Sequence, residues 1–118
     1  MKNRTNLQIV VAILFAFSAA MLIPVQASAF DEEAAKALAK SNDCFKCHAI
    51  DKSKKGPSYK KVAEKYRGKA DGQSKLIINF TTEPMVKLSD GKEEKHKIID
   101  TTDKDEMKNL ADWILSLS

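Results

Sequence analysis

The stretch Cys44-Phe45-Lys46-Cys47-His48 places two thiols three positions apart and an imidazole directly after the second thiol. These are the only cysteines in a chain of 118 residues, and His96 is the only other histidine. Side chains of these types at this spacing serve thiol–disulfide exchange, metal binding or covalent haem attachment. The rest of the sequence helps to decide which of these three kinds of chemistry applies.

Covalent haem attachment accounts for this spacing best. Cys44 and Cys47 can capture the two vinyl groups of a haem as thioethers, while His48 coordinates the iron from one face. A thioredoxin-type site would need alternating strands and helices, which the hydrophobic pattern does not show. Zinc would need about four ligands, and the histidines lie far apart in the sequence. A plain disulfide between the two cysteines is the other alternative.

The amino-terminal part of the chain has the features of an export signal. A basic start, Met1–Arg4, precedes the uncharged run Leu7–Ile23, and the small residues of Ala27-Ser28-Ala29 follow. We therefore expect residues 1–29 to be a secretory signal peptide that is cut after Ala29. An uncleaved membrane anchor is the alternative, because a run of this length is at the short end of what spans a bilayer. Either reading predicts export to the periplasm.

Loss of the signal would leave a small domain with little net charge. The whole chain carries +4, and removal of Lys2 and Arg4 lowers this to +2 for residues 30–118. Mixed charges on an exported domain argue against nucleic-acid binding, and the length excludes a multi-domain enzyme. A domain this small buries a low fraction of its surface, so a cofactor or a disulfide is expected to help stabilise it.

The hydrophobic pattern of residues 30–118 predicts helices without convincing strands, and hence an all-α domain. Helices are expected at 31–42, 58–66, 72–80 and from 102 to near the end. Between the last two, Met85–Ile99 has no sustained period and is predicted to be a solvated loop with a turn at Asp90-Gly91. In the last helix Leu110 and Trp113 should lie where it crosses the first helix, opposite Leu38. Other aromatic residues are expected to serve packing as well: Tyr59, Tyr66 and Phe80.

In this setting residues 30–118 resemble a small bacterial class I monohaem c-type cytochrome over almost their whole length. The resemblance rests on the attachment segment together with Gly56-Pro57-Ser58-Tyr59, Val62–Tyr66 and Leu110–Leu115. It implies a small cytochrome c fold of about four helices around one covalent haem c. It also implies thioethers at Cys44 and Cys47, a proximal ligand at His48, and a Pro57 carbonyl that accepts the other ring N–H of His48.

The distal ligand is where this sequence departs from the family. Relatives usually carry a methionine followed by proline before the last helix, and no Met-Pro pair occurs here. If Leu76 and Trp113 are both matched to the family pattern, the ligand position falls close to His96. We therefore expect His96 as the second iron ligand, with Met85 as the alternative and an open iron as a third possibility. Histidine would give a lower reduction potential than methionine and an acid-sensitive coordination.

A haem with both axial positions filled has no vacant site for a substrate. The resemblance thus implies a one-electron carrier rather than an enzyme, working with redox partner proteins and contacting a membrane only if the signal stays uncleaved. A ligand-responsive haem protein with a displaceable distal ligand, or a thiol–disulfide enzyme, are the competing functions. Lysines near the attachment segment could steer an acidic partner: Lys46, Lys52, Lys54, Lys55, Lys60 and Lys61.

Overall fold

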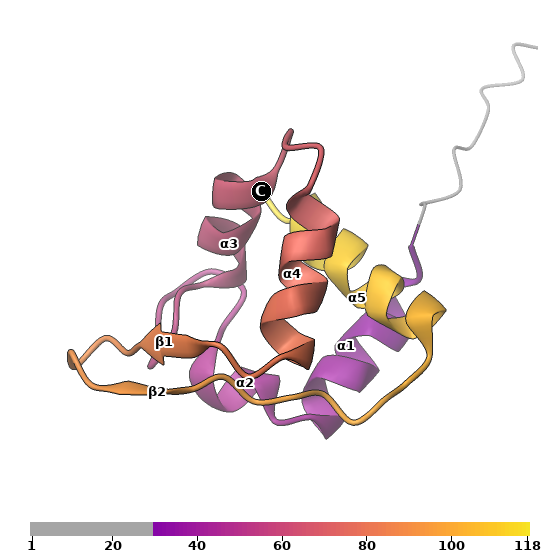
Figure 1. Ribbon diagram of the computed structural model, residues 1–118. Helices are drawn as coiled ribbons and strands as arrows, with labels where there is room; N and C mark the ends of the chain where they lie inside the picture. The colour runs from indigo at the N-terminus through magenta and orange to yellow at the C-terminus, as the bar shows by residue number, and fades with distance from the viewer. Residues whose placement is uncertain (1–29) are drawn as a thin grey trace, which may run out of the picture.

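Five helices and one two-stranded hairpin form the part of the chain that this computed structural model describes, residues 30–118 (Figure 1). In chain order they are α1 (Glu32–Ser41), α2 (Cys44–Cys47), α3 (Tyr59–Tyr66), α4 (Gly72–Thr81), β1 (Met85–Lys87), β2 (Glu93–Lys95) and α5 (Lys104–Ser116). The predicted signal peptide, residues 1–29, lies outside the described residues. Within residues 30–118 no helix is both long and apolar enough to cross a membrane.

The four longer helices confirm the helices predicted from the sequence, and the first turns of three of them show why they begin where they do. The Asp31 carboxylate accepts a hydrogen bond from the amide of Ala34 at 3.0 Å, which caps α1. Ser58 caps α3 in the same way. Asp103 caps α5 by accepting from the amides of two first-turn residues, Asp105 and Glu106. Each cap satisfies amides that the helix itself leaves without a partner.

The core lies where α5 meets the other long helices. In Figure 1 α5 crosses α1, and both α3 and α4 also pack against it. Trp113 and Leu110 of α5 are fully buried at this centre, and Leu38 of α1 packs against the same cluster. The predicted crossing of the first and last helices is confirmed. The helix-dominated fold holds the attachment segment, α2, against one end of this core.

The prediction of a strand-free loop at Met85–Ile99 was wrong, because this segment contains the antiparallel hairpin β1–β2. Its pairs are Met85 with Lys95, Val86 with Glu94 and Lys87 with Glu93. Each strand has three residues and none of its side chains is buried, so the hydrophobic alternation that would reveal a strand is missing. Opposite charges face each other at Lys87 and Glu93, which favours the pairing. The predicted turn at Asp90-Gly91 is present, with Gly91 at a φ of +86°.

Candidate haem-binding site

The attachment segment is set apart from α1 by a sharp change of direction. Asn42 ends α1 with its backbone amide bonded to Leu38, and Asp43 then adopts a left-handed conformation with φ of 59°. This turn starts the short helix α2, whose ends are the two cysteines. Residues three apart in a helix lie on one face, so Cys44 and Cys47 share a side. Both thiols are free and half-buried, and burial raises the pKa of Cys44.

His48 follows α2 and its ring is fixed by the loop that leads to α3. Its Nδ1 lies 2.7 Å from the Pro57 carbonyl oxygen. A carbonyl only accepts, so Nδ1 carries the proton and Nε2 keeps its lone pair for a metal. Burial lowers the pKa of His48, although the hydrogen bond to Pro57 acts in the opposite direction. The imidazole is therefore held neutral and oriented, which is the state that binds iron.

His96 lies just after β2 and has the same arrangement. Its backbone amide donates to the Pro84 carbonyl at 2.8 Å, and its Nδ1 lies 2.9 Å from the Lys97 carbonyl oxygen. Nδ1 again carries the proton, and Nε2 is again the nitrogen left with a free lone pair. Met85, the other candidate donor, has a side chain that is 60% exposed on β1.

The two imidazoles are close together although 48 positions separate them in the sequence. Their ring centroids lie 6.2 Å apart, with the planes tilted by 41°. Two imidazoles that bind one metal ion from opposite sides have ring centres about 6 Å apart, because each metal–nitrogen bond is about 2 Å long. The side chains present therefore fit an iron between them, with both cysteines nearby on the His48 side.

Aromatic rings support His48 from the core. Tyr59 of α3 stacks on the imidazole with 5.0 Å between centroids and 17° between planes. Trp113 and Phe45 meet the Tyr59 ring edge-on, at 5.6 and 6.0 Å. Burial raises the pKa of the Tyr59 phenol far above its ordinary range, so the phenol stays neutral. These rings form an apolar support beneath the histidine, which agrees with the packing role expected for Tyr59 and Trp113.

Gly56 lets the backbone approach His48 closely. A Cβ atom at this position would lie 2.8 Å from Cε1 and 3.2 Å from Nδ1 of the imidazole. Contacts that short do not occur between real side chains, and the ring is held between Tyr59 and the Pro57 carbonyl. The position therefore requires glycine.

Replacing Gly56 by alanine is expected to displace the His48 ring and to lower the free energy of unfolding by about 1–3 kcal/mol, as overpacking usually does. Denaturant unfolding would measure the loss, and the ring-proton chemical shifts of His48 would report the displacement. Ser53→Ala, an exposed change in the same loop, is the control and should leave both unchanged. Wild-type shifts and stability in Gly56→Ala would contradict this account of the glycine.

Asn42 is a structural contributor that the sequence did not reveal. Its side chain is 4% exposed, donates to the Leu38 carbonyl and accepts from the Asp100 amide at 2.6 Å. It thereby joins the start of the attachment segment to the chain that leaves the hairpin. Asparagine after a helix suggests a helix end, but nothing in the local pattern indicates the long-range bond.

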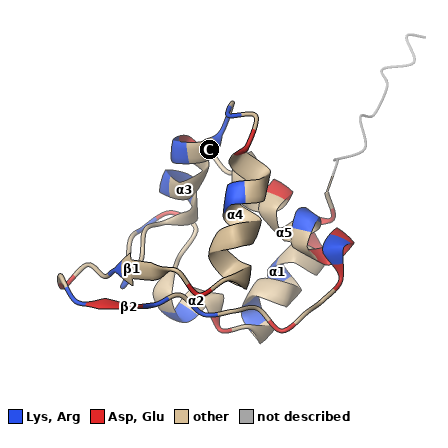
Figure 2. Cartoon of the chain, in the orientation of Figure 1, with Lys and Arg blue, Asp and Glu red and all other residues tan. Residues whose placement is uncertain are grey.

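Basic residues recur on α2, on α3 and in the loop between them (Figure 2), but the individual lysines differ in their surroundings. Lys60 pairs with Asp51 at 2.6 Å, Lys46 pairs with Asp43 at 3.2 Å, and Lys54 donates to the Phe45 carbonyl. Among the described residues, the other three lysines of the group form no ion pair: Lys52, Lys55 and Lys61. Half of the group is therefore free to interact with a partner.

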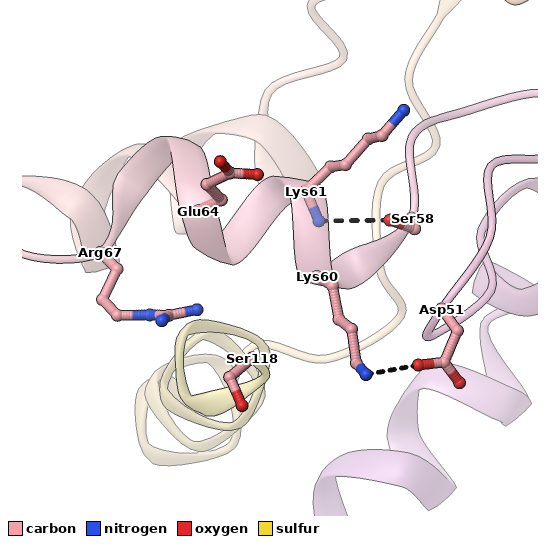
Figure 3. Close-up of a pocket in the computed structure, with 7 residues that line it drawn as sticks. All are labelled: Asp51, Ser58, Lys60, Lys61, Glu64, Arg67 and Ser118. Carbon is pink, nitrogen blue, oxygen red and sulfur yellow. Dashed lines mark hydrogen bonds and ion pairs between the residues drawn. The ribbon is translucent and has the colours of Figure 1, made fainter.

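One surface pocket is lined by neither histidine. It has a volume of about 320 Å³ and lies between α3 and the end of α5 (Figure 3). Cations and acids both line it, with Lys60 bonded to Asp51 and Arg67 donating to the Leu117 carbonyl. Its charges are largely satisfied within the protein, so the site of interest is the one around His48.

The zinc alternative finds no support in the described part of the chain. Within residues 30–118 the structure brings together no group of three or more His, Cys, Asp or Glu side chains that could hold a metal ion. The two cysteines and His48 share one segment and His96 lies near His48, but these four side chains do not form such a group.

Comparison with known proteins identifies the family of this chain. The family model described as cytochrome c matches residues 32–118. The crystal structure of class 1 cytochrome MtoD from Sideroxydans lithotrophicus ES-1 is 59% identical, covers 75% of this chain and 98% of that one, and has a TM-score of 0.73. Cytochrome c-551 of Pseudomonas aeruginosa is 33% identical over 67% of this chain and 72% of its own length. A shorter match, 45% identical, covers 34% of this chain and 43% of cytochrome c-551 of Allochromatium vinosum.

These matches also bear on the cofactor and on the class of function. The matched region contains the attachment segment, so the chain holds one covalent haem c through Cys44 and Cys47. Its relatives are electron-carrying haem proteins and not enzymes. The chain has five helices, and its structure matches that of a class 1 cytochrome, so the cytochrome c fold predicted from the sequence is confirmed. The chain belongs to the cytochrome c family.

Proposed function

We propose that this cytochrome c carries single electrons in the periplasm, with His48 and His96 as the two axial ligands of its haem iron. When bound, the haem supplies an iron that alternates between the ferric and ferrous states. Residues 30–118 form the electron-carrying domain, and residues 1–29 direct its export. The proposal for export is supported by the basic start, apolar run and small-residue ending of the first 29 residues.

The matched arrangement of the two imidazoles carries this proposal. Each Nδ1–H is engaged by a backbone carbonyl, that of Pro57 for His48 and that of Lys97 for His96. Each Nε2 is left available, and the ring centroids are 6.2 Å apart. A hydrogen bond of this kind fixes the tautomer and makes the imidazole a stronger donor to a metal. Met85 has no comparable support and is 60% exposed.

This ligation suits electron transfer rather than substrate chemistry. Backbone carbonyls hold both rings, so neither ring needs to move when the charge of the centre changes. With both axial positions taken, no position is left for a substrate. Imidazole favours the ferric state more than a thioether does, so the reduction potential should lie below that of a His/Met relative in a similar pocket.

Partners of this carrier are expected to be redox proteins with an acidic surface. Residues 44–69 contain nine Lys or Arg and only two Asp or Glu. Lys52 and Lys55 lie in the loop between the attachment segment and α3, close to where the thioether edge of the haem is held. Complementary charge of this kind raises association rates and orients an encounter.

Paired variants test the ligand assignment. We expect His96→Ala to abolish the low-spin ferric signal of the holoprotein at neutral pH and to let the reduced protein bind carbon monoxide. Met85→Ala, the matched control, should leave the low-spin signal and the reduction potential unchanged. Ferric optical and magnetic-resonance spectra measure both effects. Loss of the low-spin signal in Met85→Ala alone would show that methionine is the ligand.

A further inference from the structure

We propose that the β1–β2 hairpin is a strap that positions His96, and that one backbone hydrogen bond at its tip, from the Ser89 amide to the Lys55 carbonyl, holds the strap closed. The inference rests on the proposed function, since it concerns how the same distal histidine is held. It assigns a positioning role to Ser89 and Lys55, residues that lie outside the ligand set.

The strap is not held by side-chain packing. From Thr81 to Ile98 no side chain is buried, and the nearest buried side chains are Phe80 before this segment and Ile99 after it. A segment without buried apolar contacts belongs to the least stable part of a fold. Its position must therefore come from the hydrogen bonds that tie it to its surroundings.

Two of these bonds close the base of the strap. The Ile99 amide donates to the Phe80 carbonyl at 2.9 Å, and the His96 amide donates to the Pro84 carbonyl at 2.8 Å. The first joins the chain after the strap to the end of α4, and the second joins the two ends of the hairpin, just before β1 and just after β2. Between them lies Glu83, a non-glycine residue with φ of 52°, a conformation that side chains rarely adopt. The base alone would leave the hairpin free to swing about this point.

The tip bond joins the strap to a different part of the molecule. The Ser89 amide lies 3.0 Å from the carbonyl oxygen of Lys55, and within the described residues no other hydrogen bond links residues 85–95 to the attachment loop. The one further tie nearby is the ion pair of Lys97 with Asp43 at 3.5 Å. Both of its side chains are about half exposed, so this pair contributes little.

Lys55 is part of the loop that orients the proximal histidine. It directly precedes Gly56, whose backbone contacts the His48 ring, and Pro57, whose carbonyl accepts from His48. A groove of about 180 Å³ separates this loop from Lys87–Ser89 except where the tip bond bridges the two. The bond thus connects the supports of both imidazoles. Opening it should release His96 without disturbing His48.

The turn at the hairpin tip allows a sharp test. The Gly91 amide donates to the Leu88 carbonyl at 3.0 Å, which makes residues 88–91 a β-turn with Ser89 in its second position. Proline is favoured at that position of the common turn types. Ser89→Pro should therefore keep the turn and remove only the amide that bonds Lys55. Ser89→Ala removes the hydroxyl, keeps the amide and serves as the matched control.

Two measurements on the holoprotein report strap opening. Hydrogen exchange at the His96 amide should accelerate in Ser89→Pro, because a hairpin without its tip bond moves more freely, so that the base bond that protects this amide opens more often. Binding of imidazole to the ferric protein, followed by stopped flow, should accelerate as well. Each rate should rise roughly two- to tenfold, the range that corresponds to the net contribution of one hydrogen bond. Ser89→Ala should match the wild type in both.

The outcomes separate this inference from the ligand assignment. Unchanged amide exchange in Ser89→Pro would overturn the strap, and faster exchange without faster imidazole binding would overturn its role in positioning the ligand. Failure of the ligand assignment would show instead in a low-spin signal that survives His96→Ala. In that case the exchange rate of the His96 amide alone decides whether the hairpin is held at its tip.

Discussion

Trp113→Ala is expected to lower the free energy of unfolding by about 3–5 kcal/mol, the usual cost of truncating a buried aromatic side chain. Trp113 is 0% exposed and is one of the two largest fully buried side chains among residues 30–118. Its ring contacts Tyr59 at 5.6 Å and Phe45 at 6.5 Å between centroids. Removal would open a cavity between the helix core and the rings that support His48. Guanidinium unfolding of the oxidised holoprotein would measure the loss.

Trp113→Phe separates the contribution of packing from that of the indole N–H. Trp113 Nε1 is the one buried side-chain polar atom in the described part of the chain that has no hydrogen-bond partner. Phenylalanine lacks this N–H but keeps part of the ring contacts with Tyr59 and Phe45, so it opens a smaller cavity than alanine does. We expect Trp113→Phe to lose clearly less stability than Trp113→Ala. Equal losses in the two variants, or a loss below about 1 kcal/mol in Trp113→Ala, would contradict this description of the core.

The long helices could be predicted because each has an apolar stripe of helical period, and three of them, α1, α3 and α5, also have a polar residue that caps the first turn. Helix α2 could not, since four residues are too few to show a period. The hairpin was missed because all its side chains are outside the core, so the alternation that identifies a strand had no reason to exist. A strand can be recognised in a sequence when one of its faces is buried, because burial requires alternating apolar residues and strand pairing alone does not.

The attachment residues were evident because thioether chemistry imposes a fixed spacing on Cys44, Cys47 and His48. The prediction of His96 as a ligand depended on comparing its spacing with a family, since a single histidine between two lysines has no local signature. The bonds of Asn42 to Asp100 and of Ser89 to Lys55 were beyond reach. Backbone amides and carbonyls are present at almost every residue, so a long-range bond between them leaves no preference for residue type.

Loss of both cysteines is expected to have the largest effect of all. Cys44→Ser/Cys47→Ser should leave the mature chain without bound haem and mostly unfolded, with less than about half of the holoprotein's helical circular dichroism. The structure suggests why. Eleven apolar side chains are buried among residues 30–118, and four of them are alanines: Ala35, Ala39, Ala63 and Ala111. A core of this kind buries little apolar area, and small domains have little stability to lose.

The haem would supply the missing apolar surface at the place where α2, Tyr59 and the hairpin meet. Without the thioethers, haem could be held only by its ligands, and a chain that is already unstable would not keep His48 and His96 at 6.2 Å. Mass spectrometry and haem staining after denaturing electrophoresis would follow attachment, while circular dichroism and amide dispersion in NMR spectra would follow folding. Cys47→Ser, which keeps one thioether, is the control and should retain stained haem and most of its helix. A haem-free double variant that still unfolded cooperatively would show that the polypeptide folds on its own, and the cofactor would then have no part in holding these helices together.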